Sequence, residues 1–170
     1  SSSVINNFFI HEKHIKKWWF SNDLCRDFCL VKERLESIFK LITHSKQQSR
    51  LLKRMESKEV GHSVLAVFRR EDVSIESIRN LRTMLHFGMM DVENNIILIS
   101  GPSPAVGKTF VSVNLAAVLT SASKKVLLID GDLRKGLLHQ YLGLKRDHGL
   151  SEFVSGRIKI GEALHKTSIE

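Results

Sequence analysis

A loop of small residues that ends in a lysine and a threonine is the first feature that suggests chemistry. Gly101 and Gly107 bound this loop, and Lys108 and Thr109 follow it directly. The amides of such a loop and the positive end of the next helix favour a phosphate, whose outer oxygens the lysine reaches. The threonine hydroxyl would contact Mg²⁺. The predicted phosphate site comprises Gly101, Ser103, Pro104, Ala105, Val106, Gly107, Lys108, Thr109 and Phe110.

This loop departs in one place from the usual phosphate-loop spacing. Counting back from Lys108, the first glycine is expected at Pro102, whereas the chain places it one residue earlier, at Gly101. A Gly-Lys-Thr triplet also arises by chance, so the alternative is an ordinary surface loop. The strand pattern before the loop and the helix pattern after it favour the phosphate site.

Two aspartates follow a second apolar run at 126–129. Carboxylates beside phosphates repel them unless a cation lies between, so Asp130 and Asp132 indicate Mg²⁺. Asp130 would hold a water of the metal or accept a substrate proton, and Asp132 would share the metal. The alternative is that Asp132 caps a helix. The predicted catalytic residues are Lys108, Asp130 and Asp132, and the predicted metal ligands are Thr109, Asp130 and Asp132.

Three segments are expected to position these side chains. Runs at 96–99 and 126–129 have the pattern of strands buried on both faces of a sheet, and 110–119 has helical spacing. A connecting helix makes the two strands parallel, so both end at the edge where open α/β sheets bind ligands. The sequence therefore predicts an α/β fold with a parallel sheet flanked by helices.

Further elements are expected on either side of this unit. Residues 63–68 are predicted to form a third strand, and 137–142 a short helix. A helix is predicted over 75–90, with Ser74 as its N-cap and one apolar stripe. The stripe consists of Ile75, Ile78, Leu81, Leu85 and Met89. Tyr141, the only tyrosine, has apolar neighbours and is expected in the core rather than as a phosphate acceptor.

Four separate stretches follow a shared pattern: Ser103-Pro104 with Gly107-Lys108-Thr109, Ile129 to Arg134, Glu76 to Thr83, and Gly149 to Gly156. Together they resemble one protein family, the bacterial tyrosine kinases of polysaccharide export (the Wzc-like type). The resemblance covers roughly residues 62–170 and implies a P-loop NTPase-type fold. It also implies an ATP-dependent autokinase that transfers the γ-phosphate of Mg·ATP to tyrosines of a neighbouring subunit, regulating capsular or exopolysaccharide polymerisation and export.

The resemblance also implies partners. Glu76, Arg79 and Arg82 match the motif through which these kinases pack into homo-oligomeric rings. The alternative is a solvated helix face on which Glu76 pairs with Arg79, worth only about 0.2–0.5 kcal/mol. A membrane-anchored polysaccharide co-polymerase region of a longer parent chain and a cognate tyrosine phosphatase are expected as well. That parent would lie at the cytoplasmic face of the bacterial inner membrane, and no nucleic acid is expected.

The chain also departs from the family pattern. The 170 residues include neither the third acidic motif on a later strand nor the tyrosine-rich tail of these kinases. We therefore expect a truncated domain that binds nucleotide better than it transfers phosphate. One alternative is a ParA/MinD-type P-loop ATPase, although those proteins carry an extra lysine early in the loop. The other is a catalytically incomplete chain that acts only as an oligomerisation or interaction module.

The first 61 residues are predicted to form a separate irregular or helical extension, and residues 62–170 the kinase-like domain. The net charge of +8 is weighted towards this extension. Its clustered aromatic residues suit a membrane-proximal position or, equally, a small apolar patch on a globular domain. Residues 30–42 suggest a helix, and 44–61 a basic linker. A zinc site is disfavoured because its spacing is unusual; its residues would be His11, His14, Cys25 and Cys29. The sequence has no apolar run of about 18 residues, so no membrane span is expected.

Overall fold

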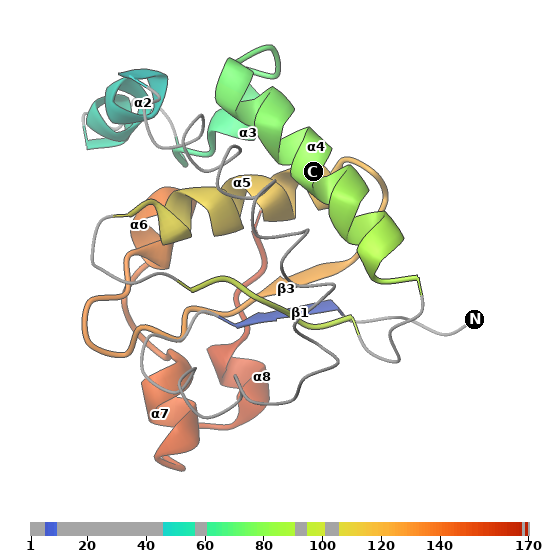
Figure 1. Cartoon of the computed structure of the whole chain (residues 1–170). Coiled ribbons are helices and arrows are strands. Elements are labelled where there is room, and N and C mark those ends of the chain that lie inside the picture. The colour runs from blue at the N-terminus through green and yellow to red at the C-terminus, as the bar shows by residue number, and fades with distance from the viewer. Residues whose placement is uncertain are drawn as a thin grey trace.

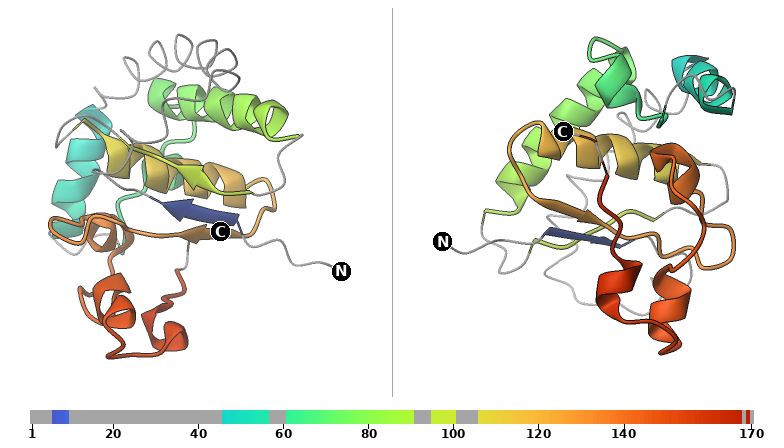
Figure 2. Two further views of the ribbon diagram at one scale, coloured as in Figure 1. Left: turned by 60° about the horizontal axis from the view of Figure 1, so that its bottom comes forward. Right: turned by 180° about the vertical axis from the view of Figure 1, so that it is seen from behind.

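The computed structural model describes residues 6–9, 46–56, 61–90, 95–100, 106–167 and 169. A three-stranded sheet lies at the centre, with α4 (Val73–Gly88) and α5 (Lys108–Thr120) on one side (Figures 1 and 2). Two short helices lie on the other side, α7 (Leu150–Val154) and α8 (Ile160–Ala163). The expected α/β architecture is therefore confirmed.

The sheet has the order β2–β1–β3, and both pairings are parallel. Its strands are β1 (Asn6–Phe9), β2 (Ile97–Leu98) and β3 (Val126–Leu128). Phe8 lies opposite Ile97 on one side and Leu128 on the other. The predicted parallel direction of the runs at 96–99 and 126–129 is confirmed. The strand between them comes from the first ten residues, which the sequence had assigned to an irregular extension.

The predicted strand at 63–68 is wrong, because residues 65–68 form a helical turn, α3 (Leu65–Phe68). Its backbone groups bond locally, since the Arg69 N–H donates to the Leu65 carbonyl at 2.8 Å. The Ala66 N–H instead finds the Asn114 side chain of α5, with Oδ1 at 2.8 Å. A short apolar run does not distinguish a buried helical turn from a buried strand, and the acceptor supplied by α5, Asn114 Oδ1, satisfies the Ala66 N–H in the helical form.

The predicted basic linker at 44–61 is also wrong in part, because it contains a helix, α2 (Lys46–Glu56). Leu51 is 5% exposed and belongs to the main core cluster. Gln48 Nε2 donates to the Ser63 carbonyl at 2.8 Å. Because basic residues dominate this segment, the sequence did not indicate that Leu51 packs in the core. The predicted helix at 30–42 and the four residues of the disfavoured zinc site lie outside the described residues.

Helix α4 begins slightly earlier than predicted. Its N-cap is Asp72, whose carboxylate accepts the Ser74 N–H at 2.8 Å. Ser74 is therefore the partner of the cap and not the cap itself, and it lies inside the first helical turn. Most of the expected stripe is confirmed, because Ile75 and Ile78 are fully buried, Leu81 is nearly so and Leu85 packs against the main core cluster. Its last member is wrong, because α4 ends at Gly88 and Met89 is the C-cap, outside both clusters. This face of α4 packs against α5.

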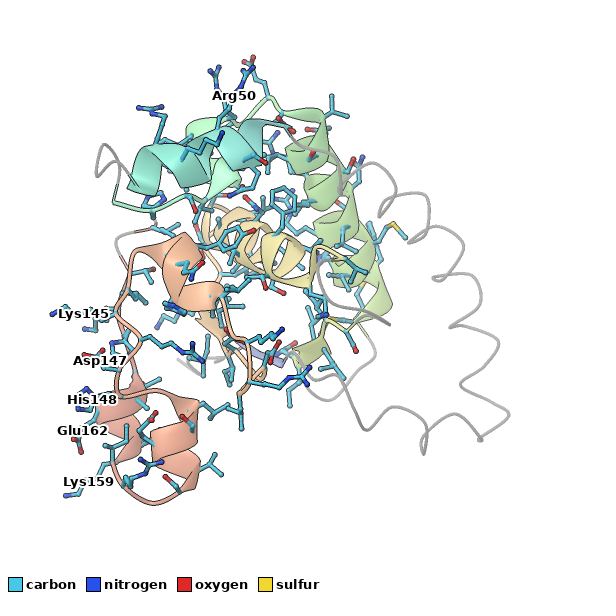
Figure 3. All side chains as sticks on the ribbon, turned by 90° about the vertical axis from the view of Figure 1, so that its left-hand side faces the viewer. Arg50, Lys145, Asp147, His148, Lys159 and Glu162 are labelled. Atoms are coloured by element: carbon cyan, nitrogen blue, oxygen red, sulfur yellow. The ribbon has the colours of Figure 1, made fainter. Side chains whose placement is uncertain are left out.

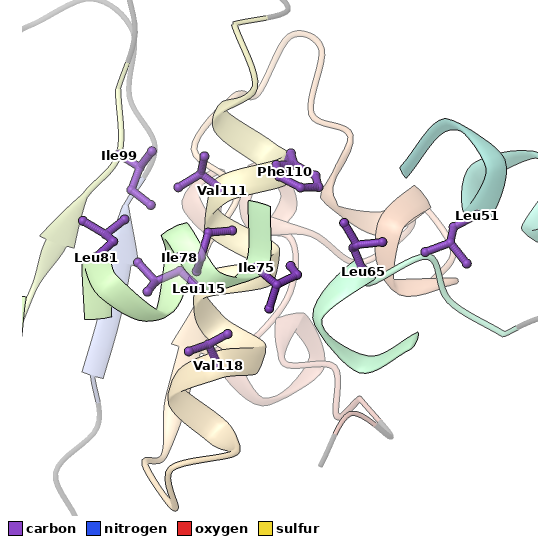
Figure 4. Packing of buried hydrophobic residues seen from close by; sticks show 10 residues of the cluster. All are labelled: Leu51, Leu65, Ile75, Ile78, Leu81, Ile99, Phe110, Val111, Leu115 and Val118. Atoms are coloured by element: carbon purple, nitrogen blue, oxygen red, sulfur yellow. The ribbon is translucent and has the colours of Figure 1, made fainter. Parts of the chain in front are cut away.

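The core is built around α5, as Figure 4 shows. One side of this helix contributes Phe110, Val111, Leu115 and Val118 to the larger cluster. The other side contributes Val113 and Ala117 to a second cluster with Val64 and Leu138. A helix with apolar residues on both sides must be covered on both, and α3, α4, α6 (Leu138–Leu142) and β3 all contact it.

The last two helices form a solvated outer part of the molecule. Each has a glutamate in its first turn that accepts the amide three residues earlier, Gly149 N–H to Glu152 and Lys159 N–H to Glu162. Exposed polar side chains of these helices and of the turn before them project outward in Figure 3, namely Lys145, Asp147, His148, Lys159 and Glu162. Among the described residues, none of the helices combines the length and apolar character that a bilayer span requires.

We predict that Asn114→Ala destabilises the fold by about 1–3 kcal/mol, because the Ala66 N–H would lose its acceptor in a buried place. Asn114 is fully buried and also donates to the Phe110 carbonyl at 2.8 Å. Urea denaturation measures the change. Thr120→Ala is the matched control, since its hydroxyl bonds only the Ala116 carbonyl of the same helix. An equal loss in both variants would contradict the role given to Asn114.

Candidate functional site

The start of α5 presents Lys108 and Thr109 as its first two residues. Gly107 precedes them with φ 94° and ψ 11°, a left-handed conformation that residues with a Cβ rarely adopt. Its carbonyl accepts the Val111 N–H at 3.0 Å and so closes the first helical turn. The thirteen-residue helix directs its positive end at this point. Residues 101–105 of the predicted phosphate loop lie outside the described residues.

Two carboxylates, Asp130 and Asp132, follow the end of strand β3. Both accept hydrogen bonds from backbone amides of the turn that follows. Asp130 accepts the Asp132 N–H on Oδ1 and the Leu138 N–H on Oδ2, each at 3.1 Å. Asp132 Oδ1 accepts the N–H groups of Arg134 and Lys135, at 3.2 and 2.9 Å. These bonds fix the orientation of both carboxylates. Each Asp130 oxygen keeps one acceptor site for another partner, and on Asp132 it is Oδ2 that stays available, because Oδ1 already accepts two N–H groups.

The alternative in which Asp132 caps a helix is close to what is observed. Asp132 binds amides in the manner of an N-cap, but residues 133–135 form a turn and the next helix starts at Leu138. A carboxylate that closes a turn remains at the surface end of its strand. The capping role and a metal role are therefore compatible.

The sheet topology brings the two halves of the candidate site to one edge. Strands β2 and β3 run in the same direction beside β1, so their carboxyl ends share an edge. Helix α5 follows β2 and packs against β3, which places Lys108 and Thr109 at the edge where Asp130 and Asp132 lie (Figure 1). Open α/β sheets bind ligands at this edge.

The donor set at this edge suits Mg²⁺ held jointly with phosphates. In the parts of the chain that the structure describes, three or more His, Cys, Asp or Glu side chains never gather in a metal-binding group. A dedicated all-protein cage is therefore absent there. Mg²⁺ commonly takes only one or two carboxylates and fills its shell with phosphate oxygens and water. Asp130, Asp132 and the Thr109 hydroxyl fit that pattern.

The side chains of two residues discussed above, Phe110 and Tyr141, pack in or against the core. The Phe110 side chain is 7% exposed and packs in the main core cluster, so only its backbone is available to the predicted phosphate site. Tyr141 packs against both core clusters, which confirms its expected place. Burial raises the pKa of the Tyr141 phenol above its ordinary value. Its carbonyl accepts the Ser63 N–H at 2.8 Å.

The proposed interface residues lie on α4. Arg79 Nη1 pairs with Glu76 Oε2 at 3.0 Å within the helix, and both side chains retain substantial exposure. This is the intrahelical pair that the solvated-face alternative predicted. It leaves both charges at the surface, where a second chain would also meet them.

Two backbone features of the site were missed in the sequence. The Leu138 N–H is a partner of Asp130, although Leu138 looks like an ordinary core residue. Gly136 lies directly against the Asp130 carboxylate. A glycine in a turn can mark a close approach of the backbone, but its position in the sequence did not indicate that Asp130 is the group that it meets.

The strand, helix start and acidic strand end together define a nucleotide-binding domain of the P-loop class. The family described as the CobQ/CobB/MinD/ParA nucleotide binding domain matches residues 97–167. That span contains β2, α5, β3 and both aspartates. The description of this family names ParA and MinD. The match therefore does not by itself separate the ParA/MinD-type alternative from the kinase.

The curated relatives and solved structures that resemble this chain include tyrosine kinases. The tyrosine-protein kinase Wzc of Salmonella typhimurium is 48% identical over 106 residues, which is 62% of this chain and 15% of that protein. The solved BceF tyrosine kinase domain is 38% identical with a TM-score of 0.66, covering 81% of this chain and 57% of that one. The solved kinase domain of Escherichia coli tyrosine kinase ETK is 43% identical with a TM-score of 0.62, covering 64% and 43%.

The comparisons confirm the resemblance that the motifs indicated: this chain is a relative of the bacterial tyrosine kinases, the Wzc-like family. It spans only 17% of the length of the curated relative from Ralstonia solanacearum, a putative tyrosine-protein kinase EpsB, and 57% of the solved BceF domain.

Proposed function

We propose that this chain contributes the ATP-binding part of a protein-tyrosine kinase, which transfers the γ-phosphate of Mg·ATP to tyrosines of a neighbouring subunit. One observation carries the proposal. Lys108 and Thr109 begin a buried helix at the same sheet edge at which Asp130 and Asp132 end a strand. The kinase names of the relatives support this reaction over simple ATP hydrolysis.

The start of α5 would bind the phosphates. Lys108 would contact the β- and γ-phosphates as a point charge, and the amides of the first helical turn would donate to their oxygens. Gly107 allows the backbone to turn sharply there without a side chain in the way. Phosphoryl transfer asks mainly for positioning and for neutralisation of charge, and these groups supply both.

The two aspartates would serve the metal and the acceptor. Asp132 and the Thr109 hydroxyl would hold Mg²⁺, which when bound neutralises charge between the phosphates. Asp130 would orient or deprotonate the tyrosine hydroxyl of the neighbouring chain, or hold a water of the metal. The hydrogen bonds from two backbone amides keep the Asp130 carboxylate from rotating. Its remaining lone pairs therefore point in a constant direction.

Assembly would use the exposed side of α4. Glu76, Arg79 and Arg82 would meet the complementary charges of a neighbouring copy in a head-to-tail contact, which closes into a ring when the rotation fits. Such an arrangement delivers the tyrosines of one chain to the site of the next. The surface pair of Glu76 and Arg79 contributes little to folding itself, so its charges remain available for this contact.

The cellular role follows from the family. The parent protein would regulate capsular or exopolysaccharide polymerisation and export from the cytoplasmic face of the inner membrane. A membrane-anchored polysaccharide co-polymerase region and a tyrosine phosphatase that resets the signal would be its partners. Detection of phosphotyrosine on the parent protein, and its loss with Lys108→Met, tests this role.

We predict that the chain binds Mg·ATP saturably and that Lys108→Ala weakens this binding at least about 10-fold, because a charge-assisted contact of roughly 1.5–3 kcal/mol is lost. Calorimetry on the purified chain measures both affinities. Arg134→Ala is the control, since Arg134 is an exposed cation of the turn after β3 whose side chain has no role in the proposal.

Three outcomes would contradict this account. Equal affinity in the wild type and in Lys108→Ala would remove Lys108 from the phosphate site. Hydrolysis of ATP without transfer to a supplied tyrosine peptide would favour the ParA/MinD-type alternative. Absence of binding in a folded sample, together with association with a full-length kinase, would favour the interaction module.

We also predict that the triple variant Glu76→Ala, Arg79→Ala, Arg82→Ala sediments as a smaller species than the wild type in analytical ultracentrifugation. The charges of one chain would no longer match those of its neighbour. Arg69→Ala with Arg70→Ala removes two exposed cations outside α4 and should leave sedimentation unchanged. An unaltered oligomer in the triple variant would refute the α4 interface.

A further inference from the structure

We propose that Gly136 is a positioning residue for Asp130, and that its missing side chain lets the turn after β3 close onto this carboxylate. The inference rests on the proposed function in so far as Asp130 serves the metal or the acceptor. The geometric part stands by itself on the described turn, which runs from Asp130 to Leu138.

Space is the constraint at Gly136. A Cβ built there would lie 2.7 Å from Asp130 Oδ2, 3.1 Å from Asp130 Cγ and 2.9 Å from the Asp132 carbonyl oxygen. Real Cβ atoms essentially never approach other atoms within 3.0 Å. Gly136 does not have the positive φ that marks Gly107, Gly143 and Gly156, so a left-handed backbone is not the reason for a glycine here. Only the close approach requires glycine.

The crowded oxygen is the one that holds the turn closed. Asp130 Oδ2 accepts the Leu138 N–H at 3.1 Å, while Oδ1 accepts the Asp132 N–H at the same distance. A methyl group at position 136 would have to displace Oδ2 or push the turn outward. Either movement breaks the bond to Leu138 and frees the carboxylate to rotate.

A rotating carboxylate would bind the metal or its water less well. Groups that orient the ligands of a metal typically change metal affinity by roughly 10- to 100-fold when they are altered. Gly136 would act in this way without touching the nucleotide. The loss would therefore appear only in the Mg²⁺-dependent part of nucleotide binding.

The test compares Gly136→Ala with Gly88→Ala. Gly88 ends α4, has no positive φ, and has nothing within 4 Å of an added Cβ, so it controls for the general effect of the substitution. Two quantities are measured on the full chain. Hydrogen exchange reports the protection of the Leu138 and Asp132 amides, and calorimetry reports ADP affinity with Mg²⁺ and with a chelator.

We expect Gly136→Ala to lose protection at Leu138 and to weaken ADP binding about 10- to 100-fold with Mg²⁺, with unchanged affinity in chelator. Gly88→Ala should match the wild type in every quantity. Wild-type protection at Leu138 in Gly136→Ala would overturn the proposal. Lost protection with an unchanged Mg²⁺ effect would also overturn it, because Gly136 would then support only the turn.

Two further results keep the test decisive. If the wild type binds no ADP, the proposed function fails, and amide exchange alone decides whether Gly136 positions Asp130. If Gly136→Ala does not fold, the double variant with Asp130→Ala removes the 2.7 Å contact and should be more stable than Gly136→Ala. A double variant that is no more stable would overturn the proposal.

Discussion

The packing of α5 on both of its sides is the constraint on which the rest of the structure depends. Its apolar residues belong to both core clusters, and the buried Asn114 ties it to α3 through a 2.8 Å hydrogen bond. A helix held in this way cannot shift along its axis without breaking the core. The positions of Lys108 and Thr109 relative to β3 therefore follow from burial far from the candidate site.

The second requirement is electrostatic. The edge of the sheet combines the positive end of α5 and Lys108 with two carboxylates, an arrangement that a polyphosphate and a divalent cation would complete. The two carboxylates carry like charges, but hydrogen bonds from four backbone amides of one turn hold them in place. The turn thus holds both carboxylates in the orientation that chemistry at this edge would use. The close approach of Gly136 to the Asp130 carboxylate belongs to the same turn.

Much of this arrangement could be predicted from the sequence, because it rests on local patterns. Two apolar runs with a helix between them predicted the parallel direction of β2 and β3, and the aspartates after 126–129 predicted the acidic edge. Long-range contacts could not be predicted. The helical turn α3 depends on an acceptor from Asn114, 48 positions away, and β1 takes its central place through pairing with strands that are remote in sequence. The amide of Leu138 lies only eight positions from Asp130, but the apolar side chain gives no sign that its backbone would bind a carboxylate.

The central claim is that the start of α5 and the end of β3 form one metal-nucleotide site. Paramagnetic broadening by Mn²⁺·ADP in a ¹⁵N-labelled sample tests it most directly, since Mn²⁺ replaces Mg²⁺ and broadens only nearby amides. The account predicts broadening of both Lys108–Thr109 and Gly131–Asp132, with Gly88 and Gly161 unaffected. Broadening at only one of the two segments, or at neither of them while ADP is bound, would contradict it.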